Sequence, residues 1–213
     1  MKGGGGSLLR ACGAALQLYN MKKINIKPCS IELYFGVPGA GKTTWAAYLS
    51  RKSMKQKRPV FSNVFIKGAY AYEKSDLGVY AIENALVIVD EAGLEFDNRK
   101  MSMTDDEIYF FKYHRHYQND IVFFSQGLDV DIKIRKLAQR YYLLQPSIIP
   151  FCILRKTIDR KVGIDDNGQI IDKFSFRSPL FGGIKLIFAP KFRKYFDTLS
   201  RKRLELKTFP RYE

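Results

Sequence analysis

The sequence predicts an α/β fold in which a mostly parallel β-sheet carries helices on both faces, followed by a small antiparallel β extension. Short apolar runs alternate with segments of helical composition, which is typical of strand–helix–strand units. A glycine-rich segment separates the first apolar run from the first helical segment. The last third changes to longer runs rich in Ile, Phe and Lys. A chain of 213 residues is long enough for one such core and an appendage.

The elements of the core follow from local patterns. Ile31–Phe35 is a short apolar run and predicts a buried strand, and Thr43–Lys55 has helical composition with its apolar residues on one side. Thr104 followed by Glu107 is a helix-start signal, because each side chain can cap the other's backbone N–H group. Further strands are expected at 59–65, 86–89 and 121–124, and further helices at 104–117 and 131–142.

The last third predicts antiparallel strands. Residues 151–158 and 170–176 are separated by a segment that contains Asn167-Gly168, a strong hairpin signal. We therefore expect three parts: a flexible leader at 1–28, a core at 29–146, and a β-hairpin extension with a basic aromatic tail at 147–213.

The glycine-rich segment carries the most specific chemical signal. Between the first strand and the first helix, glycines allow a tight turn whose N–H groups converge on a phosphate, and the Lys and Thr that follow suit phosphate and Mg²⁺. This pattern predicts a P-loop NTPase that binds ATP and Mg²⁺; no motif reads the base, so ATP is assumed by analogy. The predicted nucleotide-binding residues are Gly36, Pro38, Gly39, Ala40, Gly41, Lys42, Thr43 and Thr44.

Two carboxylates follow the apolar strand at 86–89. Asp90 is predicted to hold Mg²⁺ together with Thr43, and Glu91 to deprotonate the attacking water, which favours hydrolysis over phosphoryl transfer. Gln126 follows the strand at 121–124 and is predicted to sense the γ-phosphate; an ordinary strand-end turn is the alternative.

Lys42, Glu91, Gln126 and one arginine form the predicted catalytic set. Arginines that could neutralise charge in the transition state are Arg115, Arg135 and Arg140, and Arg115 is the one preferred here. No local pattern marks any of them, and such arginines often come from a neighbouring subunit.

The charge is strongly basic and uneven. The chain has 36 Lys+Arg against 21 Asp+Glu, a net charge of +15, and the segment from Lys133 to Glu213 has 19 basic and 7 acidic residues. Such a field favours a polyanion, either nucleic acid or an anionic membrane surface. The tail from Lys191 to Arg211 interleaves basic and aromatic residues, which suits single-stranded nucleic acid, a membrane surface or an acidic partner, or aromatic packing on the core.

Cysteine content and hydropathy limit the cellular compartments that the sequence fits. Three cysteines without metal-like spacing indicate neither a disulfide framework nor a zinc site and fit a reducing, cytoplasmic setting. The longest stretch without a charge, Tyr141–Leu154, is shorter than the ~20 apolar residues of a spanning helix.

Taken together, the motifs resemble the zonular occludens toxin family, which is similar to the gene I assembly ATPases of filamentous phages. The resemblance runs from about Ile31 to Tyr142 and rests on the phosphate loop, Ser62-Asn63, the strand ending in Asp90-Glu91, and His114-Arg115-His116 leading to Gln126. Tyr195-Phe196-Asp197-Thr198 is similar to the Tyr-rich motif that closes the ATPase region of that family.

This resemblance implies an FtsK/HerA-like motor that works as a ring at the inner face of the host cell membrane. It implies ATP-driven export of single-stranded phage DNA, with coat and assembly proteins and an inner-membrane complex as partners. Family members commonly continue into a membrane-spanning helix, and this sequence ends before one, so we expect either a soluble form or one that docks on a separate membrane partner through residues 181–188 or the basic tail. The alternatives are a packaging, conjugation-type or helicase-like translocase and a nucleotide-gated scaffold; Glu91 argues against the scaffold.

Overall fold

The computed structural model describes residues 29–92, 96, 103–127, 132–164 and 170–197. The strands in this part of the chain form one nine-stranded sheet. The predicted leader at 1–28, the turn that contains Asn167-Gly168 and the end of the basic tail at 198–213 lie outside the described residues.

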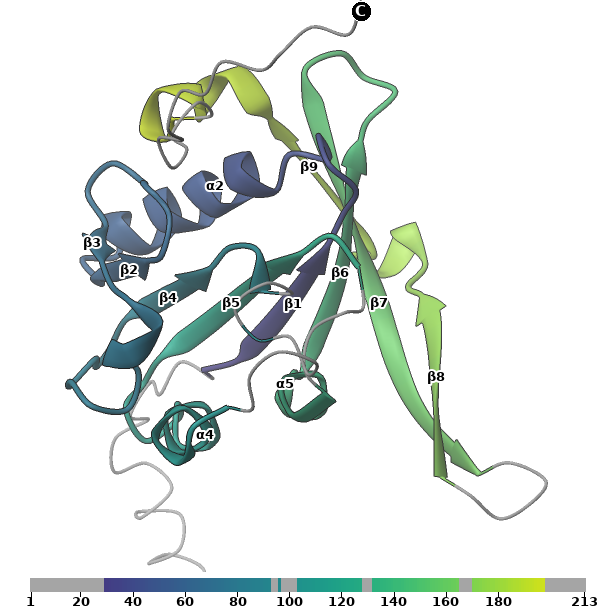
Figure 1. Cartoon of the computed structure of the whole chain (residues 1–213). Helices are drawn as coiled ribbons and strands as arrows, with labels where there is room; N and C mark the ends of the chain where they lie inside the picture. Colours follow the sequence, from purple (N-terminus) through teal and green to yellow (C-terminus); the bar gives the residue numbers. More distant parts are fainter. Residues whose placement is uncertain (1–28, 93–95, 97–102, 128–131, 165–169, 198–213) are drawn as a thin grey trace, which may run out of the picture.

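The core of the sheet is parallel. Its strands lie in the order β3-β2-β4-β5-β1-β6, and every neighbouring pair among them is parallel. Because all these strands run in one direction, their carboxyl ends meet at one edge of the sheet, where open α/β folds bind ligands (Figure 1). The bounds are β1 (Ile31–Phe35), β2 (Val60–Ser62), β3 (Tyr70–Ala71), β4 (Leu86–Val89), β5 (Asp120–Ser125) and β6 (Arg140–Pro146).

Helices cover both faces of this core. Helix α2 (Lys42–Lys55) lies on one face, and α4 (Asp105–Lys112) and α5 (Ile132–Leu137) lie on the other (Figure 1). The predicted α/β fold class is thereby confirmed. The predicted start of α4 is also observed: Glu107 N donates to Thr104 Oγ1 (3.2 Å) and Thr104 N donates to Glu107 Oε2 (3.0 Å).

Side chains of the central strands alternate between two apolar clusters. On the α2 face, Tyr34 and Phe124 pack with Trp45. On the other face, Phe123 packs with Phe111 of α4, their ring centroids 5.3 Å apart. All five side chains are buried. Burying one such side chain stabilises the folded state by about 1.5–3 kcal/mol, so the two clusters fix the positions of the strand ends.

Two predicted helices are shorter than the sequence suggests. The helix expected at 131–142 ends at Leu137, and Tyr141 and Tyr142 belong to β6, because pairing with β1 satisfies their backbone groups and buries their rings. The helix expected at 104–117 ends at Lys112. A turn at 113–118 follows it, in which buried His114 bonds the carbonyl of Phe111 through Nδ1 (2.7 Å), a packing role.

The predicted antiparallel extension is confirmed and has an additional strand. Strand β7 (Cys152–Ile164) pairs with β6 on one side. On its other side, it pairs first with β9 (Ile184–Phe188) and then with β8 (Ile170–Phe176), all antiparallel. Short 3₁₀ turns join and follow these strands: η2 (Pro179–Phe181), η3 (Ala189–Lys191) and η4 (Arg193–Tyr195), with η1 (Lys74–Asp76) in the core.

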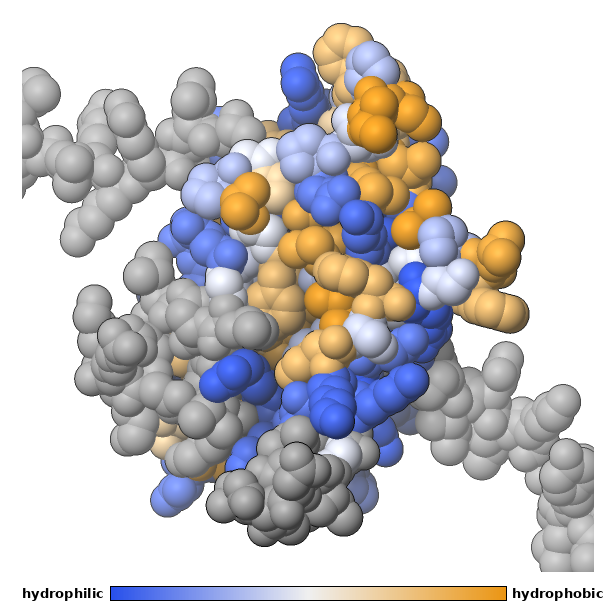
Figure 2. Space-filling view, turned by 90° about the vertical axis from the view of Figure 1, so that its right-hand side faces the viewer, coloured by the Kyte–Doolittle hydropathy of each residue, from blue (hydrophilic) through white to orange (hydrophobic). Residues whose placement is uncertain are grey.

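One face of this extension is apolar and exposed among the described residues. The other face packs against α2 through Ile153 and Ile187. The exposed face, here called the apolar face, lies beyond α5 in Figure 1, and Figure 2 shows apolar side chains gathered on that side of the molecule. Its most exposed members are Phe174 (49%), Phe176 (61%), Ile184 (43%), Leu186 (42%) and Phe188 (53%). No helix in the described part of the chain is long and apolar enough to span a membrane.

Candidate active site

The segment from Gly36 to Thr43 connects β1 to α2 and forms a tight loop at the carboxyl edge. Gly39 (φ 81°) and Gly41 (φ 91°) adopt the left-handed conformation that other residues rarely accept. A side chain at Gly41 would also clash with Ile153. No side chain caps the first turn of α2, so its N–H groups are available to an anion, as in other phosphate-binding loops.

Lys42 lies across this loop. Its ammonium donates to the carbonyl of Gly36 (2.7 Å) and to that of Val37 (3.3 Å). Burial lowers the pKa of Lys42, while the carboxylates of Asp90 and Glu91 act in the opposite direction. The ammonium forms no ion pair with any carboxylate in the described residues, so it is held over the loop by neutral partners that a phosphate can replace.

Asp90 follows β4 directly and is buried beside the start of α2. Its Oδ2 accepts from Thr43 Oγ1 (3.5 Å), and its Oδ1 accepts from Glu91 N (2.9 Å). Burial is the main cause that raises the pKa of Asp90, opposed by the hydrogen bond from Glu91 N and by Lys42. A carboxylate and a hydroxyl this close are the hard oxygen ligands that Mg²⁺ prefers, so the donor set fits the predicted ion.

Asn63 fixes the backbone that carries Asp90 and Glu91. Asn63, at the end of β2, donates to the carbonyl of Asp90 (2.9 Å) and accepts from its N–H group (2.8 Å). Glu91 has φ 52°, the left-handed region in which a residue with a side chain is strained. The Asn63 clamp therefore holds the backbone at the point where Glu91 turns toward the cleft.

The phosphate loop, Asp90 and Glu91 line one cleft of about 600 Å³, a size typical of small-ligand sites. Gln126 completes its inner wall because β5 lies between β4 and β1 in the sheet. Of the predicted residues, the structure brings together Pro38, Gly39, Gly41, Lys42, Thr43, Thr44, Asp90, Glu91 and Gln126. Gly36 contributes a carbonyl to Lys42, and Ala40 is buried within the loop.

Arg115 does not line this cleft in its own chain, and its predicted catalytic role stays a prediction. It lies in the turn after α4, which leads to the amino end of β5; there Arg58 donates to the carbonyl of Gln118 (2.9 Å). Helix α4 returns the chain to the edge opposite the cleft, where the Arg115 side chain is exposed. Arg140 also lies at that opposite edge, and Arg135 lies on α5.

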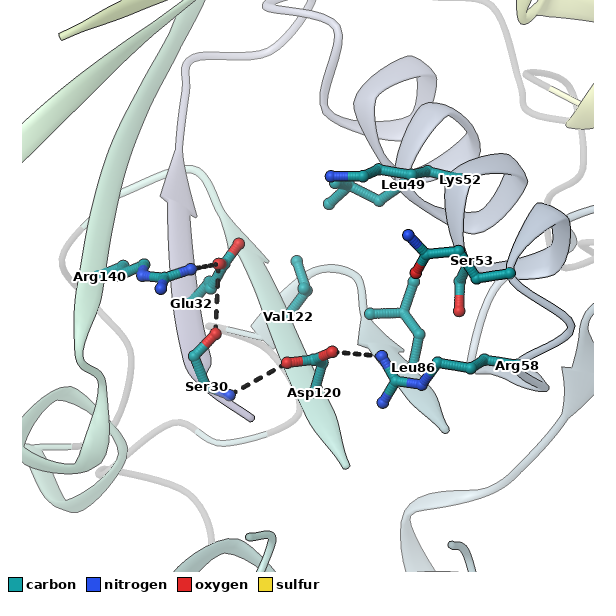
Figure 3. Close-up of a pocket in the computed structure, with 11 residues that line it drawn as sticks. Ser30, Glu32, Leu49, Lys52, Ser53, Arg58, Leu86, Asp120, Val122 and Arg140 are labelled. Atoms are coloured by element: carbon teal, nitrogen blue, oxygen red, sulfur yellow. Dashed lines mark hydrogen bonds and ion pairs between the residues drawn. The ribbon is translucent and has the colours of Figure 1, made fainter. Parts of the chain in front are cut away.

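A second, smaller pocket of about 140 Å³ lies at this amino edge (Figure 3). Arg58 forms an ion pair with Asp120, which also accepts from Ser30 N (3.1 Å). Arg140 pairs with Glu32 (2.9 Å). These contacts join the starts of β1, β5 and β6 to the segment after α2, so the charges of this pocket hold the strands together.

Three residues at or beside the cleft had no role assigned from the sequence. Asn63 and Phe196 were noted only as part of the family resemblance, although a polar residue directly after a strand next to β4 is a signal once the strand order is known. Arg193 and Phe196 line the cleft from the C-terminal segment, far away in sequence. Their positions depend on how the chain folds back after β9, which no local pattern gives.

Two sequence comparisons bear on this arrangement. The family model of zonular occludens toxin (Zot) matches residues 66–149. ORF301 of Pseudomonas phage Pf3, described as an assembly protein, is 31% identical over 119 residues. The resemblance to the zonular occludens toxin family is confirmed. The Pf3 match covers 50% of this chain and 40% of the phage protein, so the chain spans less than half the length of that relative.

The Zot match contains Asp90, Glu91 and Gln126, whereas the phosphate loop precedes it. Solved structures with a similar arrangement include the N-terminal domain of zonular occludens toxin from Neisseria meningitidis (19% identity, TM-score 0.46, covering 74% of this chain and 99% of that one). The genome-packaging NTPase B204 of Sulfolobus turreted icosahedral virus 2 is another (12% identity, TM-score 0.49, 68% and 96%).

Proposed function

We propose that this chain is an ATPase that powers the export of single-stranded phage DNA and the assembly of the virion at the host inner membrane. The observation that carries the ATPase part is the meeting of Lys42 with Asp90 and Glu91 in one cleft, from two separate segments of the chain. A cation over a phosphate loop, a hydroxyl and a carboxylate for Mg²⁺, and a second carboxylate to activate water are the parts that nucleotide hydrolysis requires.

The reaction follows from this placement. The N–H groups of the loop and the Lys42 ammonium bind the β- and γ-phosphates of ATP, and Thr43 and Asp90 would hold Mg²⁺, which neutralises phosphate charge when bound. Glu91 accepts a proton from a water molecule as the water oxygen bonds to the γ-phosphorus. The bond from the γ-phosphorus to the β-bridging oxygen breaks, and ADP and phosphate leave. Gln126 orients the water and senses the γ-phosphate.

The role in phage assembly rests on the relative and on charge. ORF301 of phage Pf3 is described as an assembly protein, and its similarity to this chain supports a role for this chain in assembly. The net charge of +15 suits a single-stranded DNA substrate and coat or assembly proteins as further partners.

Association with the membrane and with other copies of the chain is the finer part of the proposal. The exposed apolar face (Figure 2) lies beside strands β7 and β8, in which Asp159 and Asp172 are each paired with an arginine, while Lys156, Lys161 and Lys173 add further positive charge. Apolar and cationic groups together favour peripheral docking at an anionic membrane or its protein complex. In a ring, the exposed Arg115 of one subunit would face the cleft of the next and act there as the arginine finger.

The test is ATP hydrolysis by the purified chain, with and without single-stranded DNA, beside Lys42→Ala and Glu91→Gln. We expect turnover that DNA stimulates and that both substitutions abolish. Wild-type turnover no faster than that of Glu91→Gln would contradict the proposal. Unwinding of duplex DNA by the active protein would instead favour a helicase-like translocase over an assembly motor.

A further inference from the structure

The C-terminal segment 189–197 forms a wall of the cleft and is anchored at both ends. Phe192 packs edge-on against Tyr48 of α2, their ring centroids 5.5 Å apart. Tyr195 lies under the guanidinium of Arg51 (4.5 Å) and accepts a hydrogen bond from Lys67 N through its carbonyl (2.7 Å).

Phe196 then pairs with Ile66 in the connection between β2 and β3. Between these anchors, Arg193 lines the cleft together with Phe196.

Among the described residues, Arg193 is the arginine that lines the cleft, and it differs from most of the other arginines in having no assigned partner. Arg58, Arg140, Arg160 and Arg177 each form an ion pair with a carboxylate. Arg51 and Arg155 each lie over a tyrosine ring. In the described part of the chain, no hydrogen bond, ion pair or ring contact engages the Arg193 guanidinium, which is exposed on the cleft side of η4.

The charges that line the cleft explain what Arg193 is suited to bind. Asp90 and Glu91 bring two carboxylates into a site that must accept a triphosphate, and Lys42 balances only one of them. Arg193 supplies the second cation. A guanidinium is planar and always charged, and it binds phosphate oxygens through two parallel N–H groups.

We propose that Arg193 binds the phosphates of the nucleotide within its own chain, so that the segment 189–197 is a working part of the ATP site. This inference rests on the proposed function, because it assigns a further ligand of the same nucleotide. It gives the site a cation that does not depend on a neighbouring subunit. It also makes the C-terminal segment, through its anchors on α2 and on the β2–β3 connection, part of the nucleotide-bound form.

The experiment compares the dissociation constants of Mg·ATP and Mg·tripolyphosphate by calorimetry for the wild type, Arg193→Ala, Arg193→Lys and Lys194→Ala. Lys194→Ala is the matched control, because Lys194 is an exposed cation next in sequence that does not line the cleft. Its ammonium lies over the Tyr195 ring (5.4 Å), so this variant also measures any loss that comes only from loosening the anchor. Thermal unfolding of each variant checks that the fold is kept.

We expect Arg193→Ala to raise both dissociation constants roughly tenfold or more, the size of one charge-assisted contact. Arg193→Lys should restore part of the affinity, and Lys194→Ala should match the wild type. Equal affinities for Arg193→Ala and Lys194→Ala would overturn the inference while leaving the ATP site intact. A loss confined to ATP would also overturn it, because the contact would then be to the nucleoside. A wild type that binds neither ligand would overturn the proposed function as well.

Discussion

The two edges of the parallel sheet each hold a polar pocket, yet their charges are arranged in opposite ways. At the amino edge, Arg58 and Arg140 are each paired with a carboxylate of a neighbouring strand (Figure 3). At the carboxyl edge, Lys42 is held by carbonyl groups and Arg193 has no partner among the described residues.

Paired charges stabilise a fold, whereas charges left without a counter-ion are positioned for a ligand. We therefore assign the paired charges of the amino edge to fold stability and the cations of the carboxyl edge to nucleotide binding, although arginines and carboxylates line both edges.

The largest expected effect is at the carboxyl edge. Glu91→Gln removes the proton acceptor but keeps the shape and the backbone turn, so we expect kcat for ATP to fall by about 10²–10⁴-fold with nucleotide affinity retained. Steady-state turnover and calorimetric binding measure the two quantities separately. A loss of affinity equal to the loss of kcat would show that Glu91 binds the nucleotide rather than activating water.

At the amino edge, the same kind of change should affect stability instead. Arg58→Ala takes the cation away from the half-buried Asp120, and we expect a loss somewhat smaller than the cost of about 3–5 kcal/mol for breaking a fully buried pair. Urea unfolding should show this loss in the free energy of unfolding, while nucleotide affinity per folded molecule stays at the wild-type value. A stable Arg58→Ala protein with weakened ATP binding would reverse the assignment of the two edges.

Asn63 tests whether the clamp on the Asp90 backbone matters for function. Asn63→Ala removes both hydrogen bonds to Asp90, and loss of a group that orients a ligand typically costs about 10–100-fold in activity. We expect a fall of that size in kcat/KM and a higher Mg²⁺ concentration for half-maximal turnover. An Asn63→Ala enzyme with wild-type Mg²⁺ dependence would restrict Asn63 to a packing role.

The smallest expected effect concerns the free-energy cost of burying the Asp90 carboxylate. Burial raises the pKa of Asp90 above its ordinary value of 3.8, so the folded state binds this proton more tightly than the unfolded state. The stability that this tighter proton binding contributes is fully present below the pKa of Asp90 in the unfolded state. It is lost as pH rises through the pKa of Asp90 in the folded state.

Asp90→Asn removes the charge, and at neutral pH we expect a Tm a few degrees above the wild type in the absence of nucleotide. At low pH the gain should vanish. A lower Tm at neutral pH would contradict the account of this carboxylate.

The carboxyl edge was largely predictable from sequence because its signals are local. Lys42 belongs to a loop motif, and Glu91 and Gln126 each follow an apolar strand at once. The rest depends on distant parts of the chain meeting. Arg193 reaches the cleft only because the segment after β9 crosses back over α2.

The first three residues of β6, 140–142, were predicted as the end of a helix for the same reason. The pairing of β6 with β1 decides their conformation, and that pairing joins residues more than 100 positions apart.

The measurement that tests the two-edge account most directly is amide hydrogen exchange of the whole chain with and without Mg·ATP. The account predicts slower exchange at residues 36–45, 90–91 and 193–196, all of which line or adjoin the cleft. It predicts unchanged exchange at residues 30–32 and 118–121 of the amino edge. Protection confined to the amino edge, or none at the phosphate loop, would contradict the assignment of the carboxyl edge as the nucleotide site.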